Sequence, residues 1–421
     1  MVGEAQSLGT VLREWGRIGC IGFGGPPAHI ALLRQLCVER RDWLDAQEFE
    51  DAIAACNLLP GPASTQLAIY CAWRVRGRLG ALAGGLAFIV PGLICILALS
   101  VLFLAGTPPL WVKGAGAGAG AAVAAVAVQA GWTLLGPSWA RARDRRFRWS
   151  AYLMAGGAAA ATIGPWLVLV LLGCGVIELA VRRARDGTPG RAAAGNGAPA
   201  GDGAAAGDGA TRRSTGTAHA MTALPGLLTG AGQVVRLAGA AAGGAGLAAV
   251  AWVAVKVGAL SFGGGFVIIP LMRADAVGHG WMTSAQFLNA VALGQITPGP
   301  VVQTVAAVGY AAAGVGGGLL AALVAFAPSF AFVLGGARYV SALRDSPIAQ
   351  AFLDGAGPAA IGAILGSAIL LAEPLSQAWQ FAVLACAAVL LLPLRRGVVL
   401  TLLAAALTGL LVALAGGPLP P

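Results

Sequence analysis

The stretch GFGGPPAHIALL at Gly22–Leu33 returns later in the chain as SFGGGFVIIPL at Ser261–Leu271. Each copy is followed by a glycine–proline element, LPGPAST at Leu59–Thr65 and TPGPVVQ at Thr297–Gln303. Other matches keep the same order and spacing: Trp43 with Trp281, Phe49 with Phe287, and Pro91 with Pro328. We therefore interpret the chain as a tandem duplication in which each half contains the same pair of elements.

The composition indicates a membrane protein. The chain has 421 residues, of which 58% are hydrophobic and 10% charged, whereas soluble domains carry about 25% charged residues. A very large buried core is the alternative, but too little polar surface remains to enclose it. Runs of about 20 apolar residues, the length of a membrane-crossing helix, lie at 80–104, 115–135, 351–371 and 398–415. We expect an all-α polytopic membrane protein with about 10–13 transmembrane segments and no barrel alternation.

Charge and cysteine usage exclude other classes. The net charge of +10 is nearly all arginine, clustered between apolar runs, which is typical of loops retained in the cytoplasm. No polar domain with basic residues and exposed aromatics is present, so no nucleic-acid partner is expected. The seven cysteines form no CxxC motif, so neither a disulfide framework nor a metal site is indicated. Four charged residues within the first 20 argue against a cleavable signal.

Three regions are expected along the chain: a first repeat at 1–181, a linker at 182–222 and a second repeat at 223–421. The linker consists mainly of Gly, Ala, Asp, Thr and Arg and cannot bury enough apolar surface to order itself. We expect it to be a disordered cytoplasmic tether, with a regulatory role as the alternative.

The predicted elements of the first repeat are a helix over 8–34 broken at 22–27, a loop over 37–50, a segment over 52–73 broken at 60–62, a basic loop over 74–78, helices over 80–104 and 114–136, and a hairpin over 149–181. Those of the second are an apolar stretch over 224–272 broken at 263–265, a segment over 285–310 broken at 298–300, and helices over 317–336, 351–371, 378–394 and 397–415.

Loop charge predicts how the two halves are oriented. The basic loops Arg74–Arg78 and Arg141–Arg148 align with the loops Ala311–Val315 and Glu373–Gln377, which have no basic residue. Conversely, the neutral turns at 107–110 and 164–165 align with loops that contain arginines, at 338–344 and 395–396. Because basic loops stay in the cytoplasm, the halves are expected to insert in opposite orientations. Such inverted-topology repeats are common in secondary transporters.

Each glycine–proline element predicts a break where one helix stops and a half-helix starts. Proline at the first turn of a helix removes no hydrogen bond, and the glycines before it let the chain turn away. A helix start presents unpaired N–H groups and about half a positive charge, which together bind anions. A packing kink is the alternative, but four breaks at matched positions favour a site.

The predicted anion site combines backbone and side chains of the breaks. Its residues are Gly24, Gly25, Pro26, Gly61, Pro62, Ser64 and Thr65 in the first half, and Gly263, Gly264, Gly265, Thr297, Gly299 and Gln303 in the second. Further polar side chains beside the breaks are Asn57, Gln66, Ser261, Gln295 and Thr304. Two aligned cations inside apolar segments, Arg17 and Lys256, are added because intramembrane charges are usually functional; snorkelling to the interface is their alternative.

Glu14 and His29 are the candidates for proton coupling. Neither has a counterpart in the second half. A hydrogen-bonded interior histidine without a proton role is the alternative interpretation of His29.

With these motifs in view, the chain resembles the chromate ion transporter family in its two-domain, long-chain form. The resemblance is carried by GFGGPPAHIALLR (Gly22–Arg34), LLPGPASTQLA (Leu58–Ala68), SFGGGFVIIPLM (Ser261–Met272) and QITPGPVVQTVA (Gln295–Ala306). It implies a transporter of the inner membrane that exports chromate from the cytoplasm as a proton-coupled antiporter and confers chromate resistance, with sulfate as a competitor. The second half departs from the first at Gly265-Phe266, which stand where Pro26-Pro27 stand.

Other functions are less consistent with the sequence. An ATP-driven pump would need a GxxxxGK[ST] motif, which is absent. HExxH and GxSxG are also absent, so we expect no enzyme, no catalytic residue and no cofactor. A transporter of sulfate or another oxyanion, or an oxyanion channel, stays open, as does assembly into a homodimer.

Overall fold

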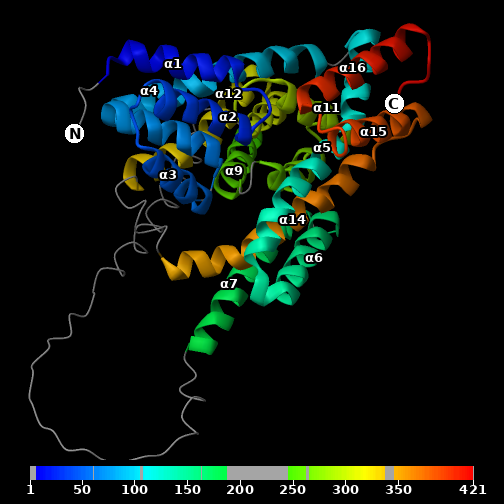
Figure 1. The fold of residues 1–421 in the computed structure, drawn as a ribbon. Helices are drawn as coiled ribbons and strands as arrows, with labels where there is room; N and C mark the ends of the chain where they lie inside the picture. Colours follow the sequence, from blue (N-terminus) through cyan, green and yellow to red (C-terminus); the bar gives the residue numbers. More distant parts are fainter. Residues whose placement is uncertain are drawn as a thin grey trace, which may run out of the picture.

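The computed structural model describes residues 6–59, 61–104, 108–162, 164–186, 245–261, 265–336 and 346–420 (Figure 1). Every regular element in these ranges is helical, which confirms the all-α prediction. In the first half they are α1 (Leu8–Ile21), α2 (Pro26–Arg34), η1 (Gln35–Arg40), α3 (Ala46–Leu58), α4 (Ala63–Phe103), α5 (Leu110–Arg141), η2 (Arg143–Arg145), α6 (Arg146–Thr162), η3 (Gly164–Trp166) and α7 (Leu167–Asp186). In the second half they are α9 (Ala245–Leu260), η4 (Phe266–Ile268), α10 (Ile269–Gly278), α11 (Ser284–Ile296), η5 (Val301–Gln303), α12 (Thr304–Gly336), α14 (Pro347–Ala372), α15 (Ala378–Leu391) and α16 (Val398–Leu414).

Two predicted boundaries were wrong. The loop expected over 37–50 is mostly helical, because η1 continues α2 as a π-helix to Arg40 and Asp45 caps α3 by accepting a hydrogen bond from the Gln47 amide. Residues 182–186, which were expected to belong to the linker, are helical, since α7 continues to Asp186. Residues 187–222 of that linker lie outside the described residues.

The helices α4 and α12 are each a hairpin of two arms. Gly77 in α4 and Gly314 in α12 have φ angles of 64° and 63°, and the residue before each is also non-helical. The chain reverses there: a Cβ atom on Gly80 would lie 2.4 Å from the Ala72 carbonyl oxygen, and one on Gly309 would lie 2.4 Å from the Gly317 oxygen. The predicted basic loop at 74–78 is therefore a tight turn.

The arms of each hairpin have different lengths. At 1.5 Å per residue, the arm before Gly77 is about 20 Å long and the arm after it about 39 Å. The hydrocarbon core of a bilayer is about 30 Å thick. The first arm is thus a half-helix, and the second is long enough to cross; α12 repeats this pattern around Gly314.

Matched crossings in the two halves reproduce the sequence duplication in three dimensions. α1 crosses α4 where a Cβ on Gly19 would lie 2.7 Å from the Phe88 oxygen, and α9 crosses α12 where one on Gly258 would lie 2.1 Å from the Ala325 oxygen. These residue pairs occupy aligned positions in the repeat. The same helix pair is therefore built twice, and both crossings use a glycine for close approach.

The remaining helices are exchanged between the halves. α5 packs against α15 and α16 of the second half, whereas α14 packs against α6 and α7 of the first. Small residues bring the backbones together, as expected for membrane helices: Gly118 lies against Gly409, and Gly156 against Ala359. In Figure 1 the α6–α7 and α15–α16 hairpins lie at opposite ends of the central α5–α14 pair.

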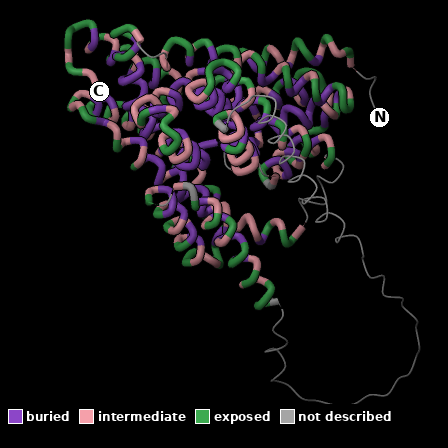
Figure 2. Tube along the Cα trace, turned by 180° about the vertical axis from the view of Figure 1, so that it is seen from behind, coloured by how far each residue is buried: buried purple, intermediate pink, exposed green. Residues whose placement is uncertain are grey.

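The distribution of apolar residues confirms a polytopic membrane protein. Among the described helices, α4, α5, α14 and the segment Val301–Gly336 are long and apolar enough to cross a membrane, and α9, α15 and α16 are shorter apolar helices. Figure 2 shows buried residues inside the bundle and exposed residues on its outer faces. Many of the exposed residues are large and apolar, such as Leu403, Leu407 and Leu411 along α16, which suits contact with lipid rather than water.

Candidate functional site

Glycines in the left-handed region of backbone space mark the predicted breaks. The φ angles are 99° at Gly24, 73° at Gly25, 117° at Gly61, 93° at Gly265 and 90° at Gly299. Other residues adopt such angles only with strain, so glycine is what allows each helix to stop. Pro60, Gly263 and Gly264 lie outside the described residues.

The half-helices after the two breaks of the first half begin at prolines, as predicted. α2 starts at Pro26, and Pro62 is the N-cap of α4. In the second half three residues of 3-10 helix follow Gly265 before α10 begins, and Pro270 lies in the first turn of α10. Pro270 thus stands in the first turn of α10, as Pro26 and Pro27 stand in the first turn of α2. Alignment of the two motifs did not predict this, because α10 starts further along its motif than α2 does.

The breaks of the two halves are in contact. The Gly299 amide donates to the Gly22 carbonyl oxygen at 2.9 Å. A Cβ atom on either Gly25 or Gly265 would lie 3.5 Å from the Val301 side chain. Three breaks, one from the first half and two from the second, therefore meet around Val301 at the start of η5.

The fourth break, at Gly61, lies against the second half. A Cβ atom on Gly61 would lie 3.3 Å from both the Gly258 oxygen and the Ser329 Oγ. Ser329 follows Pro328, and its aligned position in the first half is Gly92, where a Cβ would lie 2.0 Å from the Pro298 oxygen. Gly92, after Pro91 of the first half, therefore lies against the second break of the second half. Ser329, after Pro328 of the second half, lies against the second break of the first half. Ser329 was not among the predicted site residues; its position after the matched proline was the available signal.

His29 connects two breaks of the first half. It is 0% exposed, its Nε2 lies 2.9 Å from the Gly22 oxygen and its Nδ1 3.3 Å from the Ser64 Oγ. Because a carbonyl oxygen only accepts, Nε2 carries the hydrogen, and in the neutral ring Nδ1 accepts from the Ser64 hydroxyl. Phe88 packs edge-on against the ring at 5.0 Å. His29 is therefore a fully hydrogen-bonded interior histidine.

Several buried polar atoms at the breaks have no hydrogen-bond partner in the described part of the chain. They are Thr65 Oγ1, Ser261 Oγ, Gln295 Nε2, Gln303 Oε1 and Ser329 Oγ. An unpaired buried polar group costs about 1–3 kcal/mol, so such a set calls for an explanation. Four of the five atoms can donate a hydrogen bond, which is the chemistry that binds an oxyanion.

Other predicted polar residues are engaged within the protein. The Gln303 amide nitrogen donates to the Ile89 oxygen at 2.7 Å, and the Thr297 hydroxyl donates to the Leu293 oxygen at 3.0 Å. Thr297 therefore ends α11 rather than offering a free donor. Gly24 is exposed, whereas Gly25 is buried.

The predicted charges are exposed or paired within the protein. Arg17 is exposed on α1 and shares a shallow depression with Glu14 and Arg40. Glu14 is paired with Arg41 at 2.5 Å. Lys256 is paired with Asp275 at 2.6 Å, a partner on another helix that the pattern of aligned cations did not reveal. The buried donor set is therefore uncharged.

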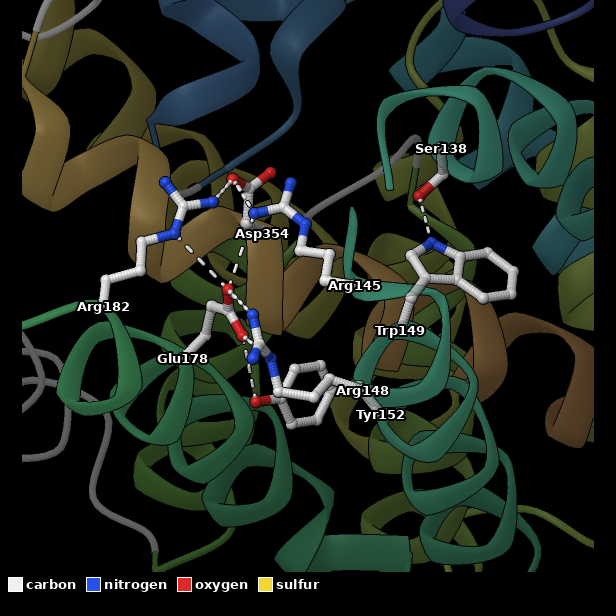
Figure 3. Close-up of polar contacts among 8 residues, drawn as sticks. All are labelled: Ser138, Arg145, Arg148, Trp149, Tyr152, Glu178, Arg182 and Asp354. Carbon is white, nitrogen blue, oxygen red and sulfur yellow. Dashed lines mark hydrogen bonds and ion pairs between the residues drawn. The ribbon is translucent and has the colours of Figure 1, made fainter. Parts of the chain in front are cut away.

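An ionic cluster joins the halves at one end of α14 (Figure 3). Glu178 on α7 is 0% exposed; it accepts from Arg148 at 2.9 Å and from the Tyr152 hydroxyl at 3.2 Å, and Arg145 and Arg182 lie 3.5 and 3.4 Å away. Asp354 on α14 pairs with Arg145 and Arg182. Sequence analysis predicted the basic loop but not these carboxylates. Within the described ranges no three His, Cys, Asp or Glu residues are arranged to hold a metal ion.

Broken helices from two matched halves, enclosing uncharged donors inside a polytopic membrane protein, define a membrane transport protein. The chain belongs to the chromate transporter family: the family model described as Chromate transporter matches residues 9–179 and 248–410, once in each half.

Relatives support this membership. A "Probable chromate transport protein" of Synechococcus elongatus is 29% identical over 375 residues, 88% of this chain and 86% of its own length. The "Chromate transport protein" of Cupriavidus metallidurans is 30% identical over 360 residues, 85% of this chain and 80% of its own. That of Pseudomonas aeruginosa is 30% identical over 361 residues, 85% and 79% of the two chains. No solved structure matches the chain.

Proposed function

We propose that this protein is a secondary active transporter that exports chromate across the inner membrane, coupled to protons, and so confers chromate resistance. The observation that carries the proposal is the set of buried, unpartnered donors at the breaks, namely Thr65, Ser261, Gln295 and Ser329. The names of the relatives support chromate as the substrate.

Neutral donors suit a tetrahedral dianion that must be released again. The half-helix starts add partial positive charge, and hydroxyl and amide groups replace water around the oxygens. A buried full cation would hold the anion more tightly and slow its departure. Sulfate has the same shape and charge as chromate, so a sulfate or general oxyanion transporter, or a channel, is the alternative function.

The membrane potential favours export. Moving two negative charges out of a cell with a negative interior releases about 4.6 kcal/mol per 100 mV. An antiporter that brings protons inward adds to this driving force.

We assign the proton to His29. Protonation of Nδ1 would stop it from accepting the Ser64 hydrogen, which frees that hydroxyl to donate elsewhere in the site. Histidine is the side chain whose ordinary pKa lies near physiological pH. Glu14, the other predicted carrier, forms an ion pair with Arg41.

We further propose that the two halves are inverted in the membrane, with the linker in the cytoplasm. Pro108 and Pro374, beside two loops predicted to be external, line one cavity. Arg145 of η2, which follows α5, and Arg182 of α7 pair with Asp354 in the ionic cluster. From Lys113 in that cavity to Arg141, α5 extends about 40 Å, roughly the thickness of a bilayer with its headgroups. This separation supports opposite membrane faces for the cavity and the cluster.

The test is chromate uptake into inverted vesicles from cells that make the protein, with vesicles lacking it as control. We expect uptake that collapses with a proton ionophore and persists in excess sulfate. Uptake abolished by a modest concentration of sulfate would show that the protein transports oxyanions in general rather than chromate in particular. Flux that ignores the ionophore and only follows the chromate gradient would indicate a channel, and absence of flux would contradict the substrate assignment.

A further inference from the structure

We propose a second anion site, an outer vestibule that holds the hydrated oxyanion between the buried donors and the external solution. It is a cavity of about 260 Å³ with lining residues that include Lys113 of α5, Gln286 and Asn289 of α11, and Gln380 of α15. The proposal rests on the proposed transport of an oxyanion and specifies where that anion enters or leaves.

The charge of this cavity favours an anion. Lys113 supplies a compact ammonium group, and none of the described lining residues is acidic. Glu373, next to the lining residue Pro374, is paired with Arg273 at 2.7 Å. A concave surface whose charged groups all have the same sign raises the local concentration of ions of the opposite sign.

The two glutamines are oriented as donors. The Gln286 Oε1 accepts from the Thr283 amide at 2.9 Å, and the Gln380 Oε1 accepts from the Ser376 and Gln377 amides at 3.1 and 3.2 Å. Because these backbone bonds occupy the amide oxygens, the NH₂ groups are the parts available to a ligand. The Gln380 Nε2 has only a long contact of 3.4 Å, to the Ala117 oxygen.

Asn289 reaches this cavity because α5 is made of small residues at that level. A Cβ atom on Gly116 would lie 2.9 Å from the Asn289 Nδ2, and one on Gly120 would lie 3.4 Å from its Oδ1. The cavity also lies at the first turns of α11 and α15, whose positive ends favour an anion.

The size indicates a hydrated ion. A water molecule occupies about 30 Å³, so the cavity has room for an oxyanion with part of its hydration shell. Gln295, one of the buried donors, lies near the other end of α11, about 14 Å beyond Gln286 and about 9 Å beyond Asn289 along the helix axis. The vestibule therefore holds the anion with its water on the external side, and the breaks bind it without that water.

A charge series at Lys113 tests the vestibule, with the full-length protein in right-side-out and inverted vesicles. The probes are chromate and, separately, sulfate, and the variants are Lys113→Arg, Lys113→Gln and Lys113→Glu. For Lys113→Gln we expect the half-saturating chromate concentration to rise roughly five- to tenfold from the outside and to stay unchanged from the cytoplasmic side. Lys113→Glu should raise it further, and Lys113→Arg should restore it.

The sidedness separates this role from a structural one. A rise of equal size from both sides, or no change from either side in vesicles where the wild type is active, would overturn the vestibule while leaving the transport proposal intact. Absence of flux by the wild type in both orientations would overturn both proposals. Gel filtration of each purified variant verifies that it is folded.

Discussion

At the scale of single residues, buried donors have no partner within the described part of the chain, at positions where apolar side chains would be more stable. Thr65 and Ser261 border breaks of different halves, and Ser329 lies against Gly61. Such groups lower stability by about 1–3 kcal/mol each, and we propose that binding of the oxyanion accounts for their presence.

Ser329→Ala removes a donor without creating an unpaired group. We expect the free energy of unfolding to stay unchanged or rise by about 1 kcal/mol, while chromate affinity falls about tenfold, as for the loss of one hydrogen bond to a charged ligand. Thermal unfolding and vesicle uptake measure the two effects. Ser100→Ala is the control, because Ser100 is buried but donates within its own helix to Ile96; an equal loss of affinity in both variants would refute the role of Ser329.

His29→Gln preserves the hydrogen bonds and removes the titration. Glutamine can donate to the Gly22 oxygen and accept from the Ser64 hydroxyl, but it does not ionise. We expect chromate transport to continue and to lose its dependence on pH over the range in which the wild-type rate changes. Uptake measured across that range, with wild type alongside, decides the matter: an unchanged pH profile would exclude His29 as the proton carrier.

Sequence patterns predicted these residues unevenly. Ser64, Thr65 and His29 were found because they adjoin glycine–proline motifs, and the structure brings them together. Ser329 follows the matched Pro328, but only the fold shows that it lies against Gly61 of the other half. For Lys256 the sequence showed a charge in an apolar run but not its neutralising partner Asp275.

At the scale of elements, the glycine turns determine where the chain reverses. Most helix positions were predicted well, because glycine and proline dictate helix ends locally. The errors concern where two helices begin. Asp45 caps α3, which therefore begins before the apolar run that was used to predict it, and α10 begins next to Pro270, further along the chain than the glycine motif predicts.

Gly314→Ala tests the hairpin turn in α12. The φ angle is 63° and a Cβ there would meet nothing within 4 Å, so the expected loss of about 1–2 kcal/mol in unfolding free energy comes from the backbone alone. Gly173→Ala is the matched control: it is equally uncrowded but helical, and it should gain about 0.5–1 kcal/mol. Chemical unfolding of the purified proteins measures both; the same sign for the two variants would contradict a left-handed turn at Gly314.

At the scale of the whole molecule, the two halves are held together by exchanged helices and by the ionic cluster. The duplication and the membrane class could be predicted from repeats and composition. The exchange of the α6–α7 and α15–α16 hairpins could not, because an apolar face does not specify which half will cover it.

Glu178→Gln tests the cluster that joins α7 to α14. Removing this buried carboxylate leaves three arginines beside a single remaining acid, Asp354, and breaking a buried pair costs about 3–5 kcal/mol. We expect a marked fall in thermal stability. Glu373→Gln, which removes an exposed partner of Arg273, should change stability little; equal effects in the two variants would show that the cluster does not stabilise the interface.

We propose that breaks from both halves form one oxyanion site, and equilibrium binding of radiolabelled chromate to the purified protein shows whether both halves contribute. Thr65→Val alters the first half and Ser261→Ala the second. We predict that each variant binds chromate about tenfold more weakly and that the double variant is weaker than either. Normal binding after a change in either half would contradict a shared site.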